Sequence, residues 1–150
     1  RALTARVRRR GMKYKRFGED IVVRLEVGEE VVASLAEIAE REGVTFAEVS
    51  GIGAADEFDV SVYDVKAKVY FDNTFREPLE ITSLSGTVTE MNGAPYVHIH
   101  AAACRRDGTA VGGHLKRAVI SATCELVLHT VYGRVPRFYD ERTGLNLMEL

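Results

Sequence analysis

Apolar and polar residues alternate along several short stretches of the chain, and in one stretch they follow a helical period instead. Alternation with period two is typical of half-buried β-strands, whereas apolar residues three or four apart indicate one face of an α-helix. The helical period lies in residues 29–42 and ends at Gly43. Its apolar stripe consists of Val32, Leu35, Ala36 and Ala39. The expected strands cover residues 21–27, 46–53, 56–62, 66–71, 79–91, 96–105 and 125–132.

Two dipeptides predict tight turns between neighbouring strands. Asn92-Gly93 is the strongest hairpin signal in the chain, because both residues tolerate the positive φ angles of a type I′ turn. Asp107-Gly108 is the second, and it leads toward Gly112-Gly113-His114. No internal repeat or linker interrupts the pattern. The chain is therefore predicted to be a single compact α+β domain, with a mixed or mostly antiparallel sheet and one main helix packed on it.

Two histidines of the expected strand 96–105 are candidate metal ligands. His98 and His100 are two residues apart, so they point to the same face of the strand, roughly 6–7 Å apart along it. Ala102 and Cys104 share that face. The opposite face carries Val97, Ile99, Ala101 and Ala103.

A third histidine is expected to join this pair. The turn at Asp107-Gly108 brings His114 close to His98 and His100, while Gly112 and Gly113 allow close backbone approach and leave room for an ion, water or ligand. Three imidazoles leave one coordination position open, which is typical of a reactive or ligand-binding metal site. Zn²⁺ suits this set best, and nickel, cobalt or iron would also fit. The alternative is a set of hydrogen-bonded histidines on a wet or interfacial sheet face.

The fourth histidine follows a different pattern. His129 shares a strand face with Glu125 and Val127, opposite the apolar Leu126 and Leu128. We therefore expect His129 to be an exposed or interface residue rather than a fourth ligand.

Composition narrows the class of protein. A chain of 150 residues with 46% hydrophobic and 28% charged residues is long enough for one domain with a substantial core. No apolar run approaches the roughly 18 residues of a membrane helix, and no apolar segment of a secretory signal follows the basic N-terminus. The two cysteines, Cys104 and Cys124, have no CxxC spacing and are predicted to be reduced core residues. A cytoplasmic location without membrane contact is expected.

The net charge of −2 conceals a strong asymmetry. Residues 1–16 contain eight Lys or Arg and no acid, so residues 17–150 carry 12 basic and 22 acidic residues, about −10. The basic segment is either an arm that contacts nucleic-acid phosphates or an extension that precedes a natural start at Met12. It lacks the Arg-Gly-Arg-Pro core of an AT-hook. We treat residues 1–11 as a basic N-terminal extension and residues 12–150 as the domain.

Several motifs in combination resemble one known family. They are Ser50-Gly51-Ile52-Gly53-Ala54, Leu84-Ser85-Gly86-Thr87-Val88, His98-Ile99-His100-Ala101, Gly112-Gly113-His114-Leu115 and Phe138-Tyr139-Asp140-Glu141-Arg142-Thr143-Gly144-Leu145. This set resembles the plants and prokaryotes conserved (PPC) domain over residues 12–150. The resemblance implies a compact α+β domain that assembles as a homotrimer. It also implies a DNA-binding or regulatory role, because plant members join the domain to AT-hooks and stand-alone prokaryotic members carry a DNA-binding description.

A more distant similarity concerns the histidines. His98, His100 and His114 are similar in order and approximate spacing to the three zinc ligands of acetolactate decarboxylases. The auxiliary carboxylates and arginine of that family have no firm match here, and Glu57, Glu90 and Arg105 are the candidates. This similarity implies the second functional class, a metal-dependent lyase or hydrolase acting on a small oxo or hydroxy acid. The expected partners are other copies of the chain, DNA or a small-molecule ligand.

Overall fold

The computed structural model describes residues 12–150, which form one helix and nine strands. The elements in chain order are β1 (Lys13–Phe17), β2 (Asp20–Glu26), α1 (Val31–Glu42), β3 (Ala47–Asp64), β4 (Val69–Phe75), β5 (Leu79–Met91), β6 (Ala94–Cys104), β7 (Ala110–Thr130), β8 (Arg137–Asp140) and β9 (Leu145–Met148). The predicted single α+β domain with one main helix is confirmed, and every paired strand in residues 12–150 is antiparallel to its neighbour. The same residues include no helix long and apolar enough to span a membrane.

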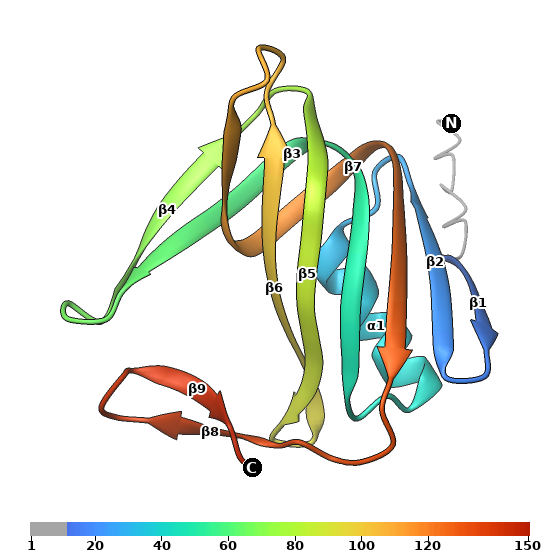
Figure 1. The fold of residues 1–150 in the computed structure, drawn as a ribbon, viewed down its shortest axis with the longest axis vertical. Coiled ribbons are helices and arrows are strands. Elements are labelled where there is room, and N and C mark those ends of the chain that lie inside the picture. Colours follow the sequence, from blue (N-terminus) through green and yellow to red (C-terminus); the bar gives the residue numbers. More distant parts are fainter. Residues whose placement is uncertain (1–11) are drawn as a thin grey trace, which may run out of the picture.

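Helix α1 ends at Glu42, as the pattern predicts, and begins at Val31, two residues after the expected start. The Glu30 side chain caps its N-terminus by accepting hydrogen bonds from the backbone N–H groups of Val32 and Ala33, at 3.0 and 2.7 Å. The same carboxylate accepts from the N–H of Ala118, which ties the helix start to β7. Gly43 adopts the left-handed conformation that ends the helix. The helix packs against the inner face of the sheet through Val31, Leu35, Ile38 and Ala39 (Figure 1). Leu35 and Ala39 of the predicted stripe are therefore buried, whereas Val32 and Ala36 are only partly buried.

Two long strands, β3 and β7, organise the main sheet. The first half of β3 lies between β5 and the end of β7, whereas its second half pairs with the beginning of β7 and with β4. Because β6 joins β5 to the beginning of β7, the strands β3, β5, β6 and β7 form a closed ring of pairings. Figure 1 shows that β3 and β7 are long and strongly bent.

The bending of these strands corrects the sequence prediction. Residues 46–53 and 56–62 were expected as separate strands, and residues 125–132 as an isolated one; instead they belong to β3 and to the end of β7. Register shifts between Gly51 and Gly53, and again before Glu57, let β3 bend without losing its pairing. Each such bulge adds a residue, so the side chains after it point inward at odd rather than even positions, or the reverse. In the sequence, the alternation of apolar and polar residues is therefore interrupted, and one strand looks like two.

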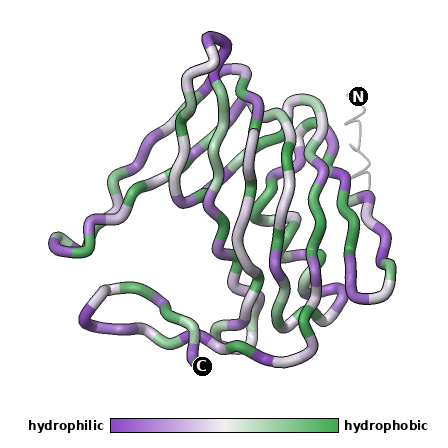
Figure 2. Tube along the Cα trace, in the orientation of Figure 1, coloured by the Kyte–Doolittle hydropathy of each residue, from purple (hydrophilic) through white to green (hydrophobic). Residues whose placement is uncertain are grey.

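The hydrophobic core lies between α1 and the inner face of the sheet. Alternate strand residues point into it, and polar residues gather at the hairpin turns (Figure 2). Its largest fully buried side chains are Phe58, Ile21, Leu25, Leu35, Ile38, Leu84, Ile99, Ile120, Leu126 and Leu128, together with Val23 and Val31. The pattern did not predict β1, β8 or β9, which contribute none of these side chains.

The β3–β4 and β8–β9 hairpins extend as arms to the same side of the sheet (Figure 1). Their ends are tied together, because the Tyr63 hydroxyl donates to the carbonyl of Thr143 at 2.8 Å and Lys68 Nζ donates to the carbonyl of Glu141 at 2.5 Å. The chain thereby brings its C-terminal hairpin next to the strands that carry the three histidines.

Candidate metal centre

Three histidines converge at the junction of β6 and β7. His98 and His100 lie two apart on β6, and His114 on β7 is paired in register with His100. The ring centroids are 5.2 Å apart for His98 and His100, 5.2 Å for His98 and His114, and 5.7 Å for His100 and His114. One nitrogen of each ring lies within 4.8 Å of the others. Imidazole nitrogens on one zinc ion are about 3.3 Å apart, so small side-chain rotations complete the set.

The alternation of side chains along β6 places His98 and His100 on the same face of the strand, as predicted. Ile99, Ala101 and Ala103 of β6 are buried in the core, whereas His98 is half-buried and His100 exposed on the opposite face. The alternation that buries the apolar residues therefore directs both imidazoles outward on the same face.

Glycines let the backbones around the histidines approach closely. A Cβ at Gly112 would lie 2.5 Å from the carbonyl oxygen of Ala101, and one at Gly113 would lie 2.6 Å from that of Ser61. Both distances are too short for a side chain, so the predicted close approach at Gly112 and Gly113 is confirmed. These two glycines line a separate hollow beside His100, not the larger cavity into which all three histidines open.

The histidines form part of the wall of a cavity of about 390 Å³. The remaining lining residues come from both arms and from β6, and they are Tyr63, Tyr70, Tyr96, Arg137, Leu145, Asn146, Leu147 and Met148. The Tyr70 ring centroid lies 5.6 Å from that of His114. Among the described residues, no aspartate or glutamate lines this cavity.

Burial favours the neutral imidazole at His98 and at His114. It lowers the pKa of His98 to about 4, with further contributions from the positive charges of His114, Arg137 and His100. Burial, followed by His100 and Lys116, also lowers the pKa of His114. Neutral imidazole is the form that binds a metal ion, so at neutral pH no proton must leave these two rings first. The donor set therefore fits Zn²⁺ and similar divalent ions.

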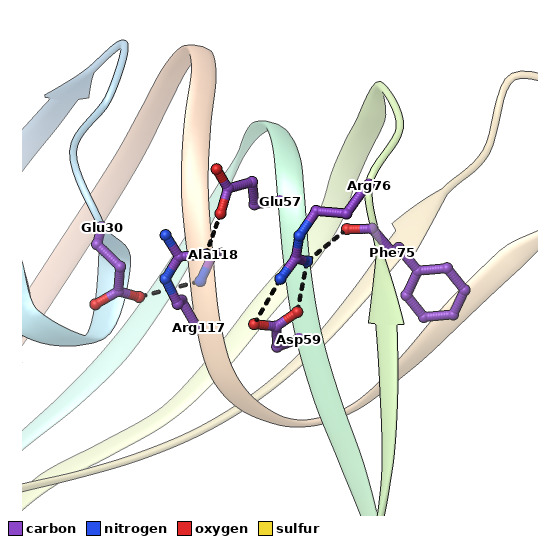
Figure 3. A network of polar contacts seen from close by, with 7 residues as sticks. All are labelled: Glu30, Glu57, Asp59, Phe75, Arg76, Arg117 and Ala118. Carbon is purple, nitrogen blue, oxygen red and sulfur yellow. Dashed lines mark hydrogen bonds and ion pairs between the residues drawn. The ribbon is translucent and has the colours of Figure 1, made fainter.

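The candidate auxiliary residues lie outside this cavity. Glu57 pairs with Arg117 in a network that also joins Asp59 to Arg76 (Figure 3). Glu90 pairs with Arg134 at 2.9 Å, and Arg105 pairs with Glu77 at 3.0 Å. None of the three candidates, Glu57, Glu90 and Arg105, lines the cavity, because each is held by an ion pair elsewhere.

The two cysteines differ in burial. Cys124 is fully buried, and burial raises the pKa of its thiol to about 12. Cys104 is only partly buried, so its predicted place in the core is wrong. It lies at the end of β6, where the strand leaves the core for the exposed turn. Neither cysteine forms a disulfide with a described residue.

His129 is exposed on β7, as predicted, and takes no part in the cluster. Its Nδ1 lies 2.8 Å from Asp20 Oδ1, and this hydrogen bond raises the pKa of His129 above 6.5.

Replacing Asp20 with asparagine is expected to lower the pKa of His129 toward 6.5. Because the pKa is raised in the folded protein, the pair stabilises the fold fully below the unfolded value of about 6.5, and the contribution is lost as pH rises through the folded pKa. An NMR titration of the His129 ring measures the shift in parent and variant. Identical titration midpoints would contradict the assignment.

Sequence reasoning missed most of the cavity wall. Tyr63 directly follows the expected strand 56–62, and Tyr70 lies in the expected strand 66–71. The two tyrosines pair across β3 and β4, so pairing of these two strands was the available signal. Arg137 and Asn146 had no local signal. They reach the histidines only because the C-terminal hairpin folds back from about 30 residues away in sequence.

A closed antiparallel sheet, one packed helix and three converging histidines define an α+β domain with a candidate mononuclear metal centre. The sequence profile of the Plants and Prokaryotes Conserved domain, abbreviated PCC or PPC, matches residues 12–131, and this chain belongs to that family. The predicted resemblance is confirmed. No curated protein matches the chain by sequence.

Solved structures share the fold over nearly the whole chain. A protein from Bacteroides thetaiotaomicron, described as a "putative DNA binding protein", is 33% identical with a TM-score of 0.89, covering 92% of this chain and 96% of that one. A protein from Archaeoglobus fulgidus, described as metal-containing, is 34% identical with a TM-score of 0.83, covering 93% and 98%. The α-acetolactate decarboxylase of Bacillus subtilis, 15% identical, shares the fold at a TM-score of 0.54, covering 81% and 56%.

Proposed function

We propose that this chain is a homotrimeric PPC-domain protein that binds a zinc ion through His98, His100 and His114. The convergence of three imidazoles on one cavity carries the proposal. The metal-containing description of the Archaeoglobus fulgidus relative supports it. When bound, zinc would supply a Lewis acid at the inner end of the cavity. Nickel, cobalt and iron are the alternative ions for this donor set.

Calorimetric titration of zinc into chelator-treated protein tests the metal site. We expect one zinc ion per chain, because the three ligands come from one chain and lie within reach of one ion. Competition with cobalt and nickel then ranks the ions. Absence of stoichiometric binding of any of them would contradict the proposal.

An exposed apolar stripe supports the homotrimer. Val22, Ile52 and Val127 lie on neighbouring strands of the outer sheet face, and 45%, 56% and 39% of their surfaces are exposed. Such a stripe on a sheet face is typical of a subunit contact. Sedimentation equilibrium is expected to give three times the 16.6 kDa chain mass, and Val127→Glu to reduce that value.

We further propose that DNA contact, the role described for the relative from Bacteroides, depends on the basic N-terminal residues. Residues 17–150 carry about −10, so they repel a duplex unless assembly gathers their basic groups. The basic extension 1–11 lies outside the described residues, which begin at Met12.

Deleting residues 1–11 is expected to remove salt-sensitive retention on DNA. The deletion removes five arginines, so the magnitude of the slope of log binding constant against log salt should fall by up to about 4.5. Filter binding at several salt concentrations measures the slope. Sequence-selective binding that survives the deletion would assign DNA recognition to the domain instead.

The second candidate function is a metal-dependent lyase or hydrolase acting on a small oxo or hydroxy acid. One observation favours it: the cluster opens into a partly open cavity with an arginine and three tyrosines in its wall. Glu57, Glu90 and Arg105 would not serve it, because they lie outside the cavity, so a phenol of Tyr63, Tyr70 or Tyr96 is the available proton donor. The unbonded cysteines support a reducing, cytoplasmic location for either function.

A further inference from the structure

Arg137 is held rigidly in the wall of the histidine cavity. Its Nε donates to Thr89 Oγ1 at 2.8 Å, and its Nη1 donates to the backbone carbonyl of Asn146 at 2.7 Å. Its guanidinium carbon lies 4.6 Å from the centroid of the Tyr96 ring. Thr89 is itself fully buried. These contacts fix the plane and position of the guanidinium before any ligand arrives.

One end of this guanidinium lacks a partner. Arg137 Nη2 is shielded from solvent and forms no hydrogen bond with residues 12–150. Arginine stays charged in proteins and presents its N–H donors as a planar fork suited to carboxylates. A buried donor without an acceptor loses its hydrogen bond to water and gains none in return, so it destabilises the fold. Such a group is therefore expected where a ligand supplies the missing acceptor.

The charge of Arg137 is also uncompensated. No aspartate or glutamate of residues 12–150 forms an ion pair with it, and none lines the cavity. Arg137 and the three histidines line the same cavity. With a divalent ion on the three histidines, this carboxylate-free cavity would hold a charge of about +3. An anion is the ligand that balances it.

We propose that this cavity binds a small organic carboxylate, with the carboxylate on Arg137 and the rest of the molecule beside the three histidines. The proposal rests on the proposed metal site. A volume of about 390 Å³ admits a small organic acid. Leu145, Leu147 and Met148 provide an apolar wall for a short carbon chain, while the tyrosine hydroxyls suit hydroxyl or oxo oxygens.

Cobalt-loaded protein provides the test, because the visible absorption of Co²⁺ reports a ligand arriving beside the ion. The probe is L-lactate, and the matched control is L-lactamide, which has the same shape without the negative charge. We expect lactate to change the spectrum with saturation and lactamide to bind at least about 10-fold more weakly. Equal responses to the two compounds would overturn the proposal, as would no response to lactate, while leaving the metal site intact.

Variants assign the carboxylate to Arg137. Arg137→Gln is expected to weaken lactate binding by about 10- to 100-fold with unchanged cobalt stoichiometry, and Arg137→Lys to weaken it less. Arg134→Gln is the control, because Arg134 is exposed, pairs with Glu90 and does not line this cavity. Lactate affinity that is unaltered in Arg137→Gln would overturn the assignment. Failure of the parent protein to bind cobalt would overturn the proposed function, and this inference with it. The lactate and lactamide comparison needs no variant, so it decides the question even if Arg137→Gln fails to fold.

Discussion

Replacing both His98 and His100 with alanine is expected to lower bound zinc from about one ion per chain to less than about 0.1 after dialysis. Two of the three converging ligands disappear, and the remaining His114 is a single imidazole. Loss of a residue that hydrogen-bonds to a metal ligand commonly weakens metal affinity by about 10- to 100-fold. Loss of two of the ligands themselves should therefore weaken zinc affinity by more than about 100-fold. Elemental analysis of parent and variant measures the difference.

The fourth histidine supplies the control for this experiment. His129→Ala removes an imidazole of the same chemistry from an exposed position outside the cluster. We expect this variant to retain the zinc content of the parent protein. The folded state of the double variant should persist, because His100 is exposed and His98 only half-buried. Equal zinc loss in both variants would indicate nonspecific binding, and zinc retained by the double variant would exclude the cluster as the site.

Gly86→Ala is expected to destabilise the fold by at least about 3 kcal/mol and to weaken zinc binding at the same time. A Cβ at Gly86 would lie 2.0 Å from the carbonyl oxygen of His98, which belongs to the paired strand β6. The contact is with backbone, so β6 must move away from β5 to relieve it. That movement displaces His98, which β6 carries, relative to His114 on β7. Chemical denaturation and zinc calorimetry measure the two effects.

A second glycine separates this clash from ordinary backbone strain. Gly28 has a φ of +88°, and no atom lies within 4 Å of where its Cβ would be. Gly28→Ala should therefore cost only about 1–2 kcal/mol, from the left-handed conformation, and leave zinc affinity unchanged. If Gly86→Ala instead matched Gly28→Ala in both stability and zinc affinity, then the close approach of β5 and β6 would not be what positions His98.

Much of the site could be predicted because it depends on local periodicity. The two-residue period of β6 sends Ile99 into the core and His98 outward, whatever the rest of the fold does. Asp107-Gly108 predicted the turn that brings His114 beside His100, and Gly112 and Gly113 predicted the close backbone contact. Each inference needed only neighbouring residues and the geometry of antiparallel strands.

Other features of the site and fold depended on long-range arrangement. Glu57 and Glu90 carry suitable carboxylates, but partners distant in sequence, Arg117 and Arg134, hold them away from the cavity. The continuous strands β3 and β7 were divided in the sequence pattern, because bulges shift the alternation within one strand.

The sequence by itself determined the one helix, most of the strands, the family and the three histidines on one face, since these follow from short-range periodicity, turn residues and local motifs. The tertiary structure alone decided that β3, β5, β6 and β7 close into a ring and that the C-terminal hairpin covers the histidines. It also decided that Arg137, and no aspartate or glutamate among residues 12–150, lines the cavity of the candidate metal site. The physical reason is that burial and charge balance depend on segments far apart in the chain. These segments come into contact only when the whole domain packs, so a local sequence pattern does not predict the contact.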